Sequence, residues 1–93
     1  MNIFIYGILK DSEINKLRKK TRHNLGVKIK EIRESKNLTQ VDLASRIDGR
    51  FDTSNVSRIE SGRINTTVFT LFRIAKALDV NIADLLDIEV FEN

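Results

Sequence analysis

The sequence predicts an all-α fold, a five-helix bundle within one small domain, and three observations support this prediction. The chain has 93 residues, which is enough for a single domain. It contains no proline, the residue that most often breaks helices. From about residue 25 onward, apolar residues recur at helical spacing in segments that are separated by capping and turn residues. We therefore expect a helical domain over residues 22–93, preceded by an extension of residues 1–21.

The extension has two parts of different character. Residues 2–9 are rich in β-branched and aromatic types, which favour a strand, but the run is too short to distinguish a strand from a helix. Residues 11–24 place Ile14 and Leu17 on one side of a helix that Ser12 can cap. The basic residues around them are Lys16, Arg18, Lys19, Lys20 and Arg22. This second part is either a phosphate-binding basic arm or a short amphipathic helix with a solvated basic face.

The first helix of the bundle is expected from residue 25. Leu25, Ile29 and Ile32 are spaced i, i+4 and i+7, so they share one helix face. Asn37 is a suitable end for this helix, because asparagine tolerates the left-handed backbone conformation found at helix ends.

A second, short helix is predicted by the capping box that Thr39 and Asp42 form, a hydroxyl at the N-cap with an acid three residues later. Its apolar face consists of Leu43, Ala44 and Ile47. The dipeptide Asp48-Gly49 is a turn signal that ends it.

The third helix follows this turn and begins at Asp52 or Thr53, either of which can cap it. Val56 and Ile59 are expected to face inward, and Ser61-Gly62 ends the helix with glycine just beyond the last turn.

Two further helices complete the bundle. Residues 65–79 carry an apolar stripe at i, i+3, i+4, i+7 and i+10, made of Val68, Leu71, Phe72, Ala75 and Leu78. Asn81 and Asp84 repeat the polar-x-x-acid start, and a short fifth helix runs through Leu85 and Leu86.

The charge is unevenly distributed along the chain. Residues 1–63 hold 14 Lys/Arg and 8 Asp/Glu, whereas residues 64–93 hold 2 and 5, so the first part carries +6 and the second −3 of the net +3. A basic front part is typical of a protein that binds a polyanion, and ordinary surface charge is the alternative.

The sequence argues against catalysis and against a membrane span. There is no cysteine, no GxxxxGK or GxGxxG motif, and a single histidine, His23, which we expect to be a solvated surface side chain. Five helices in about 65 residues leave no room for a sizeable pocket, so we expect no enzyme activity, cofactor or metal. The longest near-apolar run, residues 3–9, is far below the roughly 20 residues that span a bilayer, and no leader peptide is recognisable. The expected compartment is the cytoplasm.

The second and third helices, with the glycine turn between them, follow the helix-turn-helix plan. The outward face of the third helix carries short hydrogen-bonding groups and one arginine, namely Ser54, Asn55, Ser57, Arg58 and Ser61. In a major groove, arginine can bond bidentately to guanine and asparagine to adenine. A plain solvent face would favour Glu, Lys and Ala, because Ser and Asn are poor helix formers. This composition therefore favours a DNA-reading helix.

Several sequence blocks resemble the phage-repressor/Cro-type helix-turn-helix of the XRE family. They are residues 38–44 (LTQVDLA), 56–63 (VSRIESGR), 71–80 (LFRIAKALDV) and 83–86 (ADLL), and their order makes the resemblance specific. The resemblance covers about residues 22–86 and implies a transcriptional regulator, most often a repressor, whose five-helix bundle binds double-stranded operator DNA. Residues 1–21 lie outside the family pattern, and the turn at residues 48–51 is about two residues longer than the family's.

The resemblance also implies roles for individual residues. The base-facing positions are Thr53, Ser54 and Arg58, with Asn55 and Ser57 beside them. The phosphate contacts are Gln40, Ser61, Arg63, Asn65 and Thr66, of which the first also braces the reading helix and the last two begin the fourth helix. Arg33 and Glu60 match an ion pair that joins the first and third helices.

Apolar residues that the bundle does not need suggest a protein partner. They are Ile3, Phe4, Ile5, Tyr6, Phe69, Val90 and Phe91. In a homodimer they would form part of the interface, and two copies would read half-sites about 34 Å apart. The apolar run at residues 3–9 also suits an antitoxin that masks a toxin. The alternatives to a repressor are therefore an antitoxin of a toxin–antitoxin pair and a controller protein of a restriction–modification system.

Overall fold

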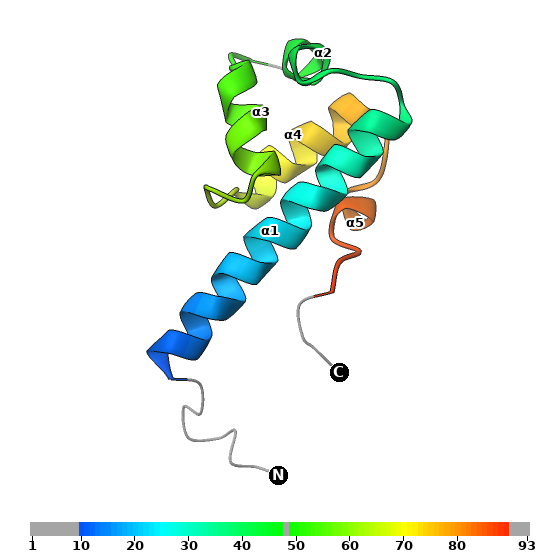
Figure 1. Cartoon of the computed structure of the whole chain (residues 1–93). Helices are drawn as coiled ribbons and strands as arrows, with labels where there is room; N and C mark the ends of the chain where they lie inside the picture. The colour runs from blue at the N-terminus through cyan, green and yellow to red at the C-terminus, as the bar shows by residue number, and fades with distance from the viewer. Residues whose placement is uncertain (1–9, 48, 90–93) are drawn as a thin grey trace.

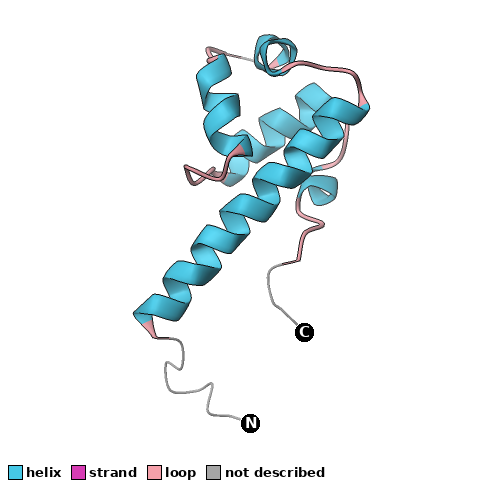
Figure 2. Cartoon of the chain, in the orientation of Figure 1, coloured by secondary structure: helices cyan, strands magenta, loops and turns pink. Residues whose placement is uncertain are grey.

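The computed structural model describes residues 10–47 and 49–89, and in this part of the chain all regular structure is helical (Figures 1 and 2). The five helices are α1 (Asp11–Ser35), α2 (Gln40–Arg46), α3 (Thr53–Glu60), α4 (Val68–Leu78) and α5 (Ile82–Leu85). The predicted all-α, five-helix fold is confirmed. Residues 2–9, for which a strand and a helix were both left open, the turn residue Asp48, and Val90 and Phe91 lie outside the described residues.

Helix α1 is a single rod of 25 residues whose N-terminal half projects from the bundle (Figure 1). The amphipathic segment and the first helix of the bundle, which we expected as separate elements, are therefore one helix that continues across residues 21 and 22. It begins at Asp11, where the backbone N–H of Lys10 donates to the Glu13 carboxylate, so Ser12 lies within the first turn rather than at the cap. It ends at Ser35 with Lys36 as the C-cap, and Asn37, the expected stop, follows in the left-handed conformation with a φ of 58°.

The core lies where the apolar faces of all five helices meet. Its buried residues are Ile29, Leu43, Ala44, Ile47, Val56, Ile59, Leu71, Ile74, Ala75, Leu78 and Leu85. The inward positions predicted for the second and third helices are all among them. Leu25 and Ile32 of α1 are partly buried against this cluster.

The predicted inward stripe of α4 is only partly right. Leu71, Ala75 and Leu78 are buried, but Val68 is 74% and Phe72 53% exposed, and Ile74 takes the inward place. The buried face of α4 consists of residues 71, 74, 75 and 78, so it is rotated about the helix axis relative to the predicted stripe.

The short helices α2, α3 and α5 begin after the N-cap residues that the sequence predicts, Thr39, Asp52 and Asn81. Thr39 Oγ1 accepts from the Asp42 N–H at 3.0 Å, and Asp42 Oδ2 accepts from the Thr39 N–H at 2.8 Å. The bond from the Thr39 backbone N–H to the charged carboxylate, followed by the interaction with the Thr39 hydroxyl, lowers the pKa of Asp42. Asp52 is the N-cap of α3 without a side-chain bond, and Asp84 accepts from the Asn81 N–H at 3.0 Å.

Two helix boundaries differ from the prediction. The fourth helix begins at Val68, because Thr67 Oγ1 accepts from the Thr70 N–H at 3.1 Å and so caps it. Asn65 and Thr66 therefore lie in the loop before α4 and do not begin it. The fifth helix ends at Leu85, and Leu86 is 51% exposed.

Among the described residues, no helix combines the length and the apolar character that crossing a membrane requires.

Candidate nucleic-acid interface

The helix-turn-helix is formed by α2, the turn after it and α3. Gly49 in the turn has a φ of 84°, a conformation that glycine adopts without strain. Phe51, at the end of the turn, is half-buried and packs against the core. The guanidinium carbon of Arg73 lies 5.5 Å from the centre of the Phe51 ring, a cation–π distance. Phe51 and Arg73 thus connect the longer turn to the core and to α4.

The outward face of α3 presents the polar side chains expected there. Ser54 is exposed, and Thr53, Asn55, Ser57 and Arg58 are half-buried. Arg58 Nη2 lies 3.5 Å from Ser54 Oγ, one helical turn away, so the two expected base-facing groups lie side by side. Val56 and Ile59 hold the opposite face of α3 in the core.

A buried ion pair fixes α3 to α1. Glu60 Oε2 accepts from Arg33 Nε at 2.6 Å, and Glu60 Oε1 accepts from Arg33 Nη2 at 2.9 Å. The two side chains are 8% and 3% exposed, respectively for arginine and glutamate. The hydrogen bonds that Arg33 donates to the Glu60 carboxylate stabilise the charged guanidinium and raise the pKa of Arg33.

The same carboxylate is shared with α2. Glu60 Oε1 also accepts from Gln40 Nε2 at 3.0 Å, and Arg33 Nη1 donates to the Leu38 carbonyl at 2.6 Å. One charged cluster therefore connects α1, the start of α2 and the end of α3. Gln40 is thus bonded to α3, as expected for the bracing role that the family resemblance implies, and its implied phosphate contact stays a prediction.

The residues after α3 surround its C-terminal end. Ser61 Oγ donates to the Arg58 carbonyl at 3.2 Å and accepts from Arg63 Nε at 2.9 Å. Ser61, Arg63 and Asn65 are exposed, and Thr66 is half-buried. The structure thus brings Ser61 and Arg63 next to Arg58.

Two contacts between α1 and the end of α3 were not predicted from the sequence. A Cβ built on Gly26 would lie 2.4 Å from the Glu60 carbonyl oxygen, so only glycine permits this approach of the two backbones. Arg22 Nε donates to the Gly62 carbonyl at 3.2 Å. A lone glycine inside a helical pattern is the signal that could have indicated the first contact.

Helix α4 carries an apolar surface patch, which we call the α4 patch and define as Val68, Phe69 and Phe72. Their exposed fractions are 74%, 68% and 53%. The guanidinium of Arg73 lies 5.9 Å from the Phe69 ring centre as well as near Phe51, and so links this patch to the turn before α3.

The part of the chain that the structure describes holds no group of three or more His, Asp or Glu side chains that could bind a metal ion. The side chain of His23 is exposed, in agreement with the expected surface position.

Comparison with known proteins identifies the relatives of this bundle. A family model described as helix-turn-helix matches residues 29–85. An uncharacterised HTH-type transcriptional regulator, y4dJ, from Sinorhizobium fredii is 35% identical over 65 residues, which are 70% of this chain and 82% of the relative. The crystal structure of the restriction-modification controller protein C.AhdI from Aeromonas hydrophila superposes with a TM-score of 0.64. It is 30% identical, and the match covers 68% of this chain and 92% of that one.

Proposed function

Because the chain belongs to the helix-turn-helix family, we propose that it binds a specific double-stranded DNA operator and represses transcription by occupying promoter DNA. The observation that carries the proposal is the placement of α3. Its Ser54 and Arg58 face outward, while the buried Arg33–Glu60 ion pair fixes the helix to α1. A helix that is fixed in this way can enter the major groove with little loss of side-chain and backbone freedom on binding.

In this proposal, α3 reads the bases and the residues around it contact phosphates. The base-reading residues are Thr53, Ser54, Asn55, Ser57 and Arg58. Arg58 is the natural partner for a guanine edge, because its guanidinium can donate two parallel hydrogen bonds. The phosphate-contacting residues are Gln40, Ser61, Arg63, Asn65 and Thr66. The last two contribute from the loop before α4.

We infer a homodimer from the α4 patch. Three large apolar side chains together on one helix are what an interface between copies would cover. A second copy related by a two-fold axis would place a second α3 on the next half-site, about 34 Å away. We propose residues 1–21 as an extension beyond the binding domain: its residues 1–9, like Val90 and Phe91, lie outside the described residues, and its residues 11–21 form the first part of α1.

The likeness to C.AhdI, a restriction-modification controller protein, favours a second candidate, a controller that can activate as well as repress. A reporter assay with the operator placed upstream of a promoter and then overlapping it separates the two candidates. A repressor lowers expression only when it overlaps the promoter, whereas a controller also raises expression from the upstream site. The antitoxin alternative depends on residues 3–9, which lie outside the described residues.

Selection of bound sequences from random duplex DNA tests the proposed function directly. We expect a two-fold symmetric motif with half-site centres about one helical turn apart. DNA that is bound without any enriched motif would contradict the proposal, because only the non-specific attraction to phosphates would then remain.

A further inference from the structure

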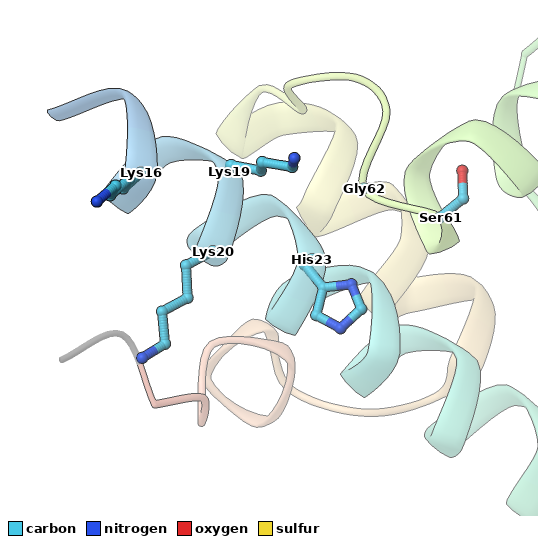
Figure 3. A pocket seen from close by; sticks show the side chains of 6 residues that line it. All are labelled: Lys16, Lys19, Lys20, His23, Ser61 and Gly62. Atoms are coloured by element: carbon cyan, nitrogen blue, oxygen red, sulfur yellow. The ribbon is translucent and has the colours of Figure 1, made fainter. Parts of the chain in front are cut away.

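A basic groove lies between the N-terminal half of α1 and the end of α3, outside the residues assigned above to base reading. Its volume is about 340 Å³ (Figure 3). We define the basic groove by the residues that line it, Lys16, Lys19, Lys20, His23, Ser61 and Gly62. The four residues from α1 are spaced i, i+3, i+4 and i+7, so they form one stripe along the helix. Figure 3 shows Lys19 pointing toward the loop that carries Gly62.

The groove has a fixed position relative to the reading helix. Gly62 has a φ of 73°, and a Cβ built on it would lie 3.0 Å from His23 Cα, so the loop after α3 is pressed against α1. Arg22 Nε donates to the Gly62 carbonyl at 3.2 Å, and this hydrogen bond also holds the loop after α3 against α1. The lysines of the groove therefore move with Ser61, the residue directly after α3.

The lining of the groove suits a chain of phosphates. Among the described residues that line it are three lysines, one histidine and one serine, and none of these is an acid. The nearest acids along α1, Asp11 and Glu13, lie in its first turn, where the Glu13 carboxylate accepts from the Lys10 N–H. From Lys16 to His23 the helix rises about 10 Å, which spans about three nucleotides of one strand along the DNA axis.

We propose that the basic groove binds the sugar–phosphate backbone of the DNA that flanks each half-site, so that α1 extends the contact beyond the bases under α3. This inference rests on the proposed function, since it takes Ser61 to lie at the DNA backbone. Lysine ammonium groups placed along a strand replace its condensed counterions, which gives affinity without sequence preference. The groove would thus add affinity, and α3 would supply specificity.

The test compares the full chain with two triple variants of equal charge. The groove variant carries Lys16→Gln, Lys19→Gln and Lys20→Gln, and the control carries Lys28→Gln, Lys30→Gln and Lys36→Gln on the rest of α1 and its end. Each protein is titrated, with fluorescence anisotropy as the readout, against two duplexes over a range of salt concentrations. One duplex ends at the selected operator motif, and the other extends it by about six base pairs on each side.

On the long duplex, we expect the slope of log affinity against log salt to shrink by about 0.9 for each phosphate that a lysine no longer neutralises, to a total near 2.7 for the groove variant. The control variant should retain a slope close to that of the original chain. On the short duplex, all three slopes should agree, since the flanking phosphates are absent. A dependence on duplex length also separates the DNA backbone from a free phosphate ion.

Equal slopes for the groove variant and the original chain on the long duplex would overturn the proposal, as would equal reductions in the groove and control variants. The single variant Lys19→Gln, with an expected change of about 0.9, provides a second measurement if the triple variant folds poorly. Failure of the original chain to prefer its operator over a scrambled duplex would instead count against the proposed function. The two failures are therefore distinguishable.

Discussion

Removal of the Glu60 carboxylate should destabilise the whole domain, because three donors depend on it. In the Glu60→Ala variant, Arg33 Nε and Nη2 lose acceptors at 2.6 and 2.9 Å, and Gln40 Nε2 loses one at 3.0 Å. The guanidinium would remain buried with the Leu38 carbonyl as its acceptor. Breaking a buried ion pair from one side costs about 3–5 kcal/mol, since the remaining charge is uncompensated.

This destabilisation is large compared with the stability of a chain of 93 residues, which is about 5–14 kcal/mol at ~0.05–0.15 kcal/mol per residue. With a denaturant dependence of about 1.5 kcal/mol per molar urea, the unfolding midpoint should fall by about 2–3 M. Urea titrations followed by far-UV circular dichroism measure this directly, because the described elements are all helices.

Two further variants make the result specific to the ion pair. Glu31→Ala removes an exposed carboxylate from α1 and should change the free energy of unfolding by less than about 0.5 kcal/mol. The double variant Arg33→Met/Glu60→Leu should recover much of the stability, because an apolar pair leaves no unpaired charge. A destabilisation below about 1 kcal/mol for Glu60→Ala would refute the reasoning that this pair is a buried clamp.

Three other perturbations test the remaining contacts. Gly26→Ala gains about 1 kcal/mol of helix propensity, but its Cβ would lie 2.4 and 2.5 Å from the carbonyl oxygens of Glu60 and Ile59. A net destabilisation of about 1–3 kcal/mol is therefore expected in thermal unfolding, and a raised melting temperature would contradict the close approach. Arg58→Ala should weaken operator binding by about 1–3 kcal/mol more than random-DNA binding in parallel titrations, whereas equal weakening would indicate a phosphate contact. Phe69→Ser should convert the dimer to a monomer in sedimentation, and a monomeric original chain at tens of micromolar would exclude the α4 patch as an interface.

The elements that could be predicted from the sequence are those with local causes. The capping boxes at Thr39 and Asn81 involve residues only three positions apart, so the starts of α2 and α5 follow from the sequence itself. In α4, by contrast, Leu71 and Ala75 are compatible with a face through Phe72 and with one through Ile74. Both choices have helical spacing, and the choice between them depends on where α2 and α5 lie. Local periodicity does not contain that information.

The candidate site was predictable to the extent that its residues follow one another along α3. The approach of α1 to the end of α3 joins residues about 30 to 40 positions apart, and its one local signal is the glycine inside the helical pattern of α1. Gly26 in particular resembles a helix breaker in the sequence, yet it lies inside α1, where the missing side chain admits the backbone of Glu60. The Arg33–Glu60 pair was expected from the family resemblance and not from spacing.

Helix α1 constrains the orientation of α3, the proposed reading helix. Three contacts connect them, namely the Arg33–Glu60 pair, the approach at Gly26 and the Arg22 bond to Gly62. They span about 16 Å of α1, more than the length of α3 itself, which is about 12 Å for eight residues. Because contacts spread over such a length resist both tilt and rotation, α3 and the basic groove form one rigid unit. A change at Gly62 should therefore alter base reading and the salt dependence together, whereas the α4 patch is connected to the turn before α3 through Arg73 and Phe51.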